Sequence, residues 1–332
     1  MHTKSLPVGE MVTLAYLAAL VIALSMIGCS PAEDPTSQEP VRIEAAPLAT
    51  PVRAPEPPTD PQPEEVTSRE VTYEEAEDAY SVRDYELASE LFTRYVDSRP
   101  DNPWGHYMLG LSAHKAGQLE SAELAFREAL HLDSTHVKSW QNLTRVFLDG
   151  GRADEALESI ARADALETES PVNLRLTGRA LHQQGNLTGA ADAYRDAILA
   201  DDTDVWSMNN LAVVLMEEGR YAQALTTLAH ATALAPEVAL FQNNLGMALE
   251  HQNAFRDAET AYGRAVELDA DYQRASANLA RILEVESVAH TAVDLAEAAR
   301  TFVRELESWR DEHVARELGD EASPTTTDAT QR

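Results

Sequence analysis

Residues 103–136 read PWGHYMLGLSAHKAGQLESAELAFREALHLDSTH, and this unit of 34 residues recurs six times, in phase and without insertions, between residues 69 and 272. The units begin at Arg69, Pro103, Val137, Pro171, Val205 and Ala239. The twentieth residue of every unit is alanine, the eighth is small or short, and the twenty-fourth is bulky. The fifteenth is glycine in four units and Asn253 in a fifth, residue types that tolerate the left-handed conformation that ends a helix. The pattern therefore predicts two helices in each unit, the first of roughly 13 residues, joined by a tight turn.

The spacing of the apolar residues also predicts how the two helices pack. In residues 103–136, Leu109, Gly110 and Ala113 share one face of the first helix, and Ala122 and Phe126 lie on the matching face of the second. Small residues at positions eight and twenty let the two backbones approach closely. One helix pair cannot bury its apolar face alone, so the units are expected to stack into an all-α solenoid.

These residues resemble the tetratricopeptide repeat, whose motif has small residues at positions eight and twenty, an aromatic residue at twenty-four and often proline at thirty-two. That proline is present only as Pro100 and Pro236, and the first unit departs further, with Glu75 where leucine is usual. The resemblance implies a superhelical solenoid over residues 69–272, with the first helices lining a concave groove.

Residues 273–318 are predicted to form a degenerate seventh unit whose second helix runs to about Leu318 and caps the array. That helix carries an apolar stripe formed by Leu295, Ala299, Phe302, Leu306 and Trp309. We expect the stripe to cover the open end of the solenoid; the alternative is a seam between two copies of the chain. Residues 319–332 are polar and predicted to be a disordered tail.

The N-terminus has the features of a secretory signal. Residues 1–28 contain Lys4 and an apolar run from Met11 to Ile27, and Met26-Ile27-Gly28-Cys29 resembles a bacterial lipobox, which implies lipidation of Cys29. The alternative is an uncleaved transmembrane anchor. Residues 29–68 are predicted to be a disordered spacer, because ten of the 16 prolines lie between residues 30 and 63. Ser30 rather than aspartate follows the cysteine, which in typical lipoproteins implies an outer-membrane location facing the periplasm.

Composition and motifs argue against several functions. The 56 acidic and 26 basic residues give a net charge of -30, which disfavours nucleic acid as a partner. With the single cysteine no intramolecular disulfide can form. The sequence has no phosphate-binding loop, dinucleotide fingerprint or hydrolase motif, and His131 and His136 are spaced wrongly for metal ligands on one helix face. We therefore predict no enzymatic activity, no cofactor and no metal site.

The resemblance implies that positions two, five, six, nine, twelve and thirteen of each unit face the groove. Position six is asparagine in four units, Asn142, Asn210, Asn244 and Asn278. Amides can pair with the backbone of a peptide, and the alternative is that they tighten contact between neighbouring units. The basic residues of this stripe are Lys138, Arg145, Arg175 and Arg179, and its apolar candidates include Trp206 and Met247. The stripe predicts binding of an extended, carboxylate-bearing peptide with an apolar anchor.

Together these features predict a lipid-anchored scaffold or adaptor of the bacterial cell envelope that binds segments of other proteins. Type IV pilus pilotins are similar in having about six such repeats behind a lipid anchor. The alternatives are a pilotin-like assembly factor for a pilus or secretion complex, and a structural oligomer formed through the C-terminal helix. The partner, the pathway and the oligomeric state are left open by the sequence.

Overall fold

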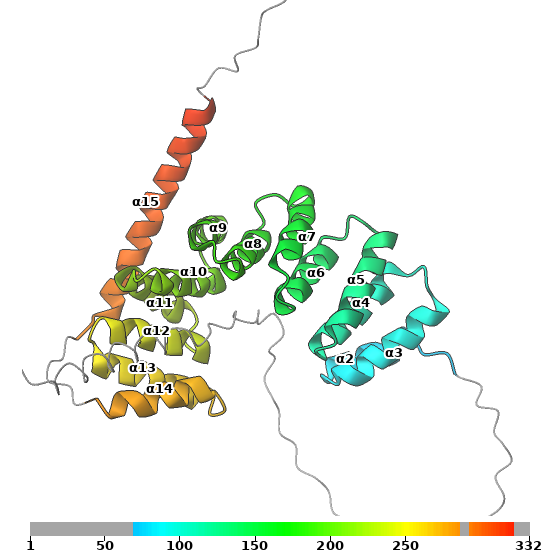
Figure 1. Ribbon diagram of the computed structural model, residues 1–332, viewed down its shortest axis with the longest axis horizontal. Coiled ribbons are helices and arrows are strands. Elements are labelled where there is room, and N and C mark those ends of the chain that lie inside the picture. Colours follow the sequence, from blue (N-terminus) through cyan, green and yellow to red (C-terminus); the bar gives the residue numbers. More distant parts are fainter. Residues whose placement is uncertain (1–68, 286–291, 322–332) are drawn as a thin grey trace, which may run out of the picture. The chain divides into compact units, whose positions relative to one another are not determined.

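The computed structural model describes residues 69–285 and 292–321, and every regular element within these two ranges is an α-helix (Figure 1). The expected signal, the spacer and most of the expected tail lie outside the described residues. Three residues assigned to the tail, 319–321, belong instead to the last helix. The helices are α2 (Tyr73–Ser81), α3 (Tyr85–Ser98), α4 (Pro103–Lys115), α5 (Leu119–Leu132), α6 (Val137–Asp149), α7 (Ala153–Leu166), α8 (Pro171–Gln183), α9 (Leu187–Ala200), α10 (Val205–Glu217), α11 (Tyr221–Leu234), α12 (Ala239–His251), α13 (Phe255–Leu268), α14 (Gln273–Leu283) and α15 (Leu295–Glu321).

The predicted helix pairs are confirmed. In units two to six the first helix begins at the first residue of the unit and spans 13 residues, and the second helix spans 14. The fifteenth residue has a positive φ of 59° to 79° in all six units. In the first unit that residue is Arg83, with φ 64°, so the turn geometry is kept where neither glycine nor asparagine is present.

The first unit departs from the others at its start. Helix α2 begins at Tyr73, four residues later than the unit itself, and Thr72 caps it. The Thr72 hydroxyl accepts a hydrogen bond from the Glu75 backbone N–H, and the Glu75 carboxylate accepts one from the Thr72 N–H. Glu75, which breaks the repeat pattern, is therefore explained as the second residue of a capping box.

Close contact between position eight and position twenty-four organises the core of several units. An added Cβ at Gly110, Gly178 or Gly246 would lie 2.6 Å from the ring of the bulky residue sixteen positions later, which is Phe126, Tyr194 and Tyr262 respectively. Each of the six alanines at position twenty is fully buried. The two helices of these units therefore meet as the repeat pattern predicts, with an aromatic ring in close contact with a glycine.

The buried apolar residues form two clusters that meet inside the fourth unit. Leu176 and Ala180 of α8 belong to the N-terminal cluster, whereas Ala190 and Tyr194 of α9 belong to the C-terminal one. The fourth unit thus joins two apolar cores, and its first helix carries the buried charge of Arg175 close to the boundary.

Helix α15 does not pair with α14 to cover the end of the array, contrary to the sequence-based expectation. It packs on α11 (Figure 1) and also contacts α9. The Phe302 ring lies 5.3 Å from the His230 ring, and the Arg195 guanidinium lies 5.5 Å from the Trp309 ring. Because Phe302 and Leu306 are buried on this surface, the stripe is not available as a seam between copies either.

Two features explain where α15 goes. The residue at position twenty-four of the seventh unit is Ala296, which is too small to fill the space above α14. Helix α11, in contrast to the other second helices of the array, contains no Asp, Glu, Lys or Arg, so the apolar face of α15 can be buried on it without desolvating a charge of α11. On α11 the helix buries the apolar side chains of Phe302 and Leu306.

Candidate functional site on the first helices

The asparagines at positions five and six form hydrogen bonds between neighbouring first helices. The Asn244 amide donates to Oδ1 of Asn209 in the preceding unit at 2.8 Å, and the Asn278 amide donates to Oδ1 of Asn243 at 2.9 Å. Asn209 and Asn243 are buried. The ladder therefore links units five, six and seven, which is the alternative interpretation of the asparagine series.

The other two asparagines also have partners within the chain. Asn210 accepts a hydrogen bond from the Asn209 amide at 3.5 Å. Asn142 donates to the Lys138 carbonyl at 2.9 Å and accepts from the Arg145 guanidinium at 3.0 Å. The bonds of Asn244 and Asn278 thus link neighbouring first helices, whereas those described here for Asn142 and Asn210 lie within α6 and α10. Binding of these four asparagines to a peptide backbone stays a prediction.

Arg175 forms a buried ion pair with the next unit. Its Nη1 lies 2.7 Å from both carboxylate oxygens of Asp204, and the two side chains are 11% and 4% exposed. Asp204 also caps α10 by accepting hydrogen bonds from the Trp206 and Ser207 N–H groups. The Arg175 charge is thus neutralised inside the fold by Asp204, and its pairing with a partner's carboxylate stays a prediction.

Arg179 and the neighbouring acid form a smaller network. The Arg179 guanidinium lies 3.4 Å from Oδ1 of Asp149, and His114 of the second unit hydrogen-bonds Oδ2 of the same carboxylate at 2.7 Å. Burial raises the pKa of Asp149, but His114 and Arg179 outweigh it and hold that pKa below its ordinary value. The charge of Arg179 is therefore partly satisfied by the chain itself. Lys138, in contrast, is exposed and makes no ion pair within the described ranges.

A hollow of about 420 Å³ lies beside Lys138, where the first helices of units two to four begin. It is lined by Trp104, His136, Val137, Lys138, Gln141, Glu167, Ser170 and Val172. Trp104 is 47% exposed although it is the largest side chain in the set. Its indole N–H donates to the Tyr73 hydroxyl at 2.8 Å, and its ring lies 5.0 Å from that of Tyr107. The exposed tryptophan is thus held in one orientation from two sides.

The chemistry of this hollow is mixed. His136 lies 4.8 Å from the Tyr107 ring, and burial lowers its pKa, with Lys138 adding to the effect and Asp133 opposing it. The imidazole is therefore mainly neutral at pH 7. One wall is aromatic and apolar, and Lys138 supplies a positive charge at the rim. Such a surface suits an apolar side chain next to a carboxylate.

Sequence reasoning missed Trp104, although a signal was present. Trp104 occupies position two of its unit, the same position as Lys138, Val172 and Trp206. The two predicted apolar anchors are less open: the Trp206 ring lies 4.9 Å from that of Phe241, and the Met247 sulfur lies 3.7 Å from the Asn243 amide.

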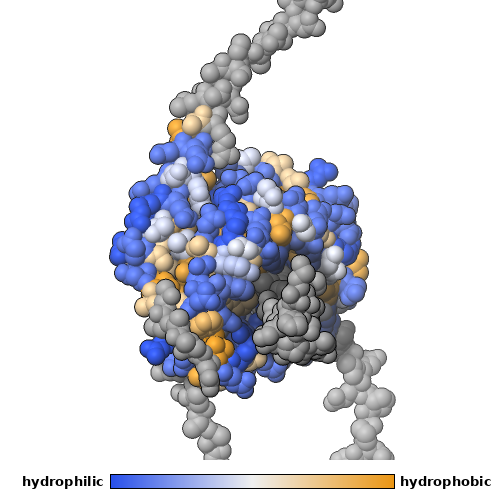
Figure 2. All heavy atoms as spheres, turned by 60° about the vertical axis from the view of Figure 1, so that its left-hand side comes forward, coloured by the Kyte–Doolittle hydropathy of each residue, from blue (hydrophilic) through white to orange (hydrophobic). Residues whose placement is uncertain are grey.

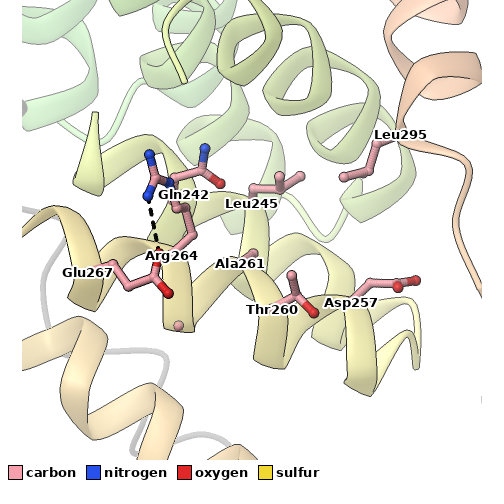
Figure 3. A pocket seen from close by; sticks show the side chains of 9 residues that line it. Gln242, Leu245, Asp257, Thr260, Ala261, Arg264, Glu267 and Leu295 are labelled. Atoms are coloured by element: carbon pink, nitrogen blue, oxygen red, sulfur yellow. Dashed lines mark hydrogen bonds and ion pairs between the residues drawn. The ribbon is translucent and has the colours of Figure 1, made fainter. Parts of the chain in front are cut away.

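A second hollow, of about 460 Å³, lies away from the inward stripe, between α12, α13 and the start of α15 (Figure 3). Leu245, Ala261 and Leu295 give it apolar walls, and Arg264 pairs with Glu267 along one side at 3.1 Å. The face shown in Figure 2 is mostly hydrophilic, with hydrophobic residues scattered in small groups. Within the described ranges no group of three or more His, Cys, Asp or Glu residues is placed to hold a metal ion. None of the described helices combines the length and the apolar character needed to cross a membrane.

Comparisons with known proteins agree with this architecture. A family model described as Tetratricopeptide repeat matches residues 73–137, 142–204 and 209–271, more than half of the chain. Anaphase-promoting complex subunit 3 of Schizosaccharomyces pombe is 24% identical over 157 residues, which are 47% of this chain and 24% of that protein. The present chain therefore spans about a quarter of the length of that relative.

Two solved structures share the fold. The APC/C hetero-tetramer Cut9-Hcn1 has a TM-score of 0.55 at 18% identity, covering 63% of this chain and 41% of that chain. The pilF protein of Pseudomonas aeruginosa has a TM-score of 0.50 at 18% identity, covering 64% of this chain and 93% of that chain. At these identities the likeness is one of fold.

Proposed function

Because this chain belongs to the tetratricopeptide repeat family, we propose that it is an interaction scaffold that binds an extended segment of another protein along the inward face of its first helices. The observation that carries this proposal is the hollow beside Trp104 and Lys138. It combines an exposed, immobilised aromatic ring with a cation that has no ion-pair partner in the described part of the chain. Exposed aromatic residues of this kind dominate the energy of many protein interfaces.

The chemistry of the hollow defines the segment that would bind there. An aromatic or large aliphatic side chain would pack between Trp104 and Val172, and a neighbouring carboxylate would pair with Lys138. Gln141, whose amide donates to Asn173 at 2.8 Å, keeps a carbonyl oxygen that can accept from a peptide N–H. The proposal keeps the predicted carboxylate-bearing peptide but moves its anchor from Trp206 and Met247 to Trp104.

We further propose that the scaffold is held in the bacterial envelope by lipid on Cys29, at the outer membrane and facing the periplasm, and that it carries out no chemistry itself. The Gly28-Cys29 junction and the preceding apolar run support the anchor. The proline-rich residues 29–68 would act as a spacer that lets the repeats reach partners away from the membrane.

Photo-crosslinking in cells tests the binding site. A photoreactive amino acid at Gln141 should capture a partner, and the same amino acid at Leu124, which is 70% exposed on the outer helix α5, should not. Trp104→Ala and Lys138→Glu should each reduce capture at Gln141 at least tenfold, a loss of about 1.4 kcal/mol. Equal capture by Trp104→Ala and wild type would refute the assigned site.

A more specific function, as an assembly factor for a pilus or secretion complex, predicts which protein the same experiment would capture. The captured protein would be a subunit of such a complex, and deleting the chain would prevent that subunit from assembling. Capture of an unrelated envelope enzyme would favour the adaptor role instead.

A further inference from the structure

In the part of the chain that the structure describes, no second helix covers α14, the first helix of the seventh unit, as one covers the first helix of each preceding unit. In units two, four and six a ring lies directly on the residue at position eight. The equivalent residue of the seventh unit is Ala280, which is exposed, because α15 packs on α11 instead. Leu283, on the same side of α14, is 61% exposed. The C-terminal end of the array therefore exposes a helix face on which another helix can pack.

The exposed face of α14 has an apolar centre and charged ends. Ala275 and Ile282 face the preceding unit and are buried, whereas Ala277, Ala280 and Leu283 are on the opposite side. Arg274 lies near the start of the helix and Glu284 follows its last residue, and neither makes an ion pair within the described ranges. The opposite end of the array is different, because the exposed residues of α2 include Glu74, Glu77 and Asp78.

We propose that a second copy of this chain covers this face, with α14 of each copy packed antiparallel on α14 of the other about a two-fold axis. The second helix of a helical hairpin runs antiparallel to the first, so α14 of the second copy would take the direction of the missing helix. A head-to-tail arrangement would instead place the acidic face of α2 on the apolar face of α14. Self-pairing of the C-terminal ends avoids that mismatch and closes as a dimer.

The residue spacing on α14 fits a two-fold axis that passes near Ala280. Leu283 then lies three residues from the axis and meets Ala277 of the second copy, also three residues away, so a large side chain packs over a small one. Arg274 is six residues from the axis and Glu284 is four, and in an antiparallel pair they approach with an offset of about 3 Å along the helix. Each dimer thus gains two equivalent ion pairs at the ends of an apolar contact.

Sedimentation velocity of the full chain in detergent tests the dimer. Wild type should be a dimer at micromolar concentration, and Leu283→Glu should raise the dissociation constant at least thirtyfold, because two carboxylates would be placed in the apolar centre. The matched control is Leu124→Glu. Leu124 is 70% exposed, more than Leu283, and lies on the outer helix α5, remote from the exposed face of α14. This control should leave the dissociation constant unchanged.

Exchanging the charges of Arg274 and Glu284 provides a second test, whose result does not depend on whether the Leu283→Glu variant folds. Glu284→Arg should weaken the dimer about tenfold by placing like charges opposite each other, and the double variant Arg274→Glu/Glu284→Arg should return to within about threefold of wild type. A wild-type chain that stays monomeric up to about 100 µM would overturn the proposal. So would a dimer that is insensitive to Leu283→Glu, or a double variant no tighter than Glu284→Arg.

Discussion

Replacement of Gly178 by alanine should destabilise the protein although alanine is the better helix former. The added Cβ would lie 2.6 Å from Cε1 and 2.7 Å from Cδ1 of Tyr194. Tyr194 is 1% exposed, so its ring cannot turn toward solvent. Overpacking of this kind costs about 1–3 kcal/mol, against about 1 kcal/mol that alanine gains over glycine inside a helix. The net change expected is a fall of up to about 2 kcal/mol in the free energy of unfolding, measured in urea titrations followed by circular dichroism.

A double-mutant cycle identifies the cause of that loss. In the fifth unit the same two positions are Ala212 and Leu228, so alanine is accommodated where the facing residue is leucine. The penalty of Gly178→Ala should therefore shrink by about 1 kcal/mol or more when it is introduced together with Tyr194→Leu. Gly263→Ala is the control, because no atom outside the adjoining backbone of its own helix lies within 4 Å of the added Cβ, and it should stabilise the protein by up to about 1 kcal/mol. A Gly178→Ala protein as stable as Gly263→Ala would refute the reasoning.

Three further predictions concern charge and lipid. Asp204→Asn keeps an oxygen for capping α10 but removes the carboxylate charge that faces the buried Arg175 guanidinium, so the free energy of unfolding should fall by about 3 kcal/mol in urea titrations. Burial lowers the pKa of His230, with Asp202 opposing, so the unfolded form binds a proton before the folded form does as the pH falls below about 6.5. Acidification should therefore weaken the packing of Phe302 on α11, which would appear as faster hydrogen exchange in α15. The variant His230→Gln should not show this effect. Radiolabelled palmitate should enter wild type but not Cys29→Ala, and equal labelling would contradict the lipid anchor.

The helix pairs could be predicted from sequence because their signals are local. Glycine or asparagine marks the turn in five units, and small and bulky residues recur at fixed intervals, so neighbouring residues carry the information. Arg83 shows the limit, since it adopts the same positive φ without a favourable residue type. There the packing of the two helices overrides the local preference of the backbone.

The site could be predicted only in part, because the chain's own partners are far away in sequence. The predicted stripe lies on the first helices, but Asp204 lies 29 residues from Arg175, and Asn209 lies 35 residues from Asn244. Only stacking of the units brings these groups together, and it converts candidate ligand contacts into internal ones. The sequence does contain a signal for the packing of α15 on α11, because α11 carries no Asp, Glu, Lys or Arg. That signal lies in the fifth unit, far along the chain from α15, so a comparison of neighbouring residues does not find it.

The return of α15 to α11 also constrains how this gene can evolve. Repeat arrays commonly lengthen or shorten by tandem duplication or loss of whole units, because each unit contacts only its neighbours. Here an extra unit inserted between α11 and α14 would carry the start of α15 away from its binding surface, while the connection after Leu283 would keep its length. An insertion ahead of α8 would leave that distance unchanged. The copy number of the C-terminal units should therefore be fixed among descendants of this gene, and that of the N-terminal units free to vary.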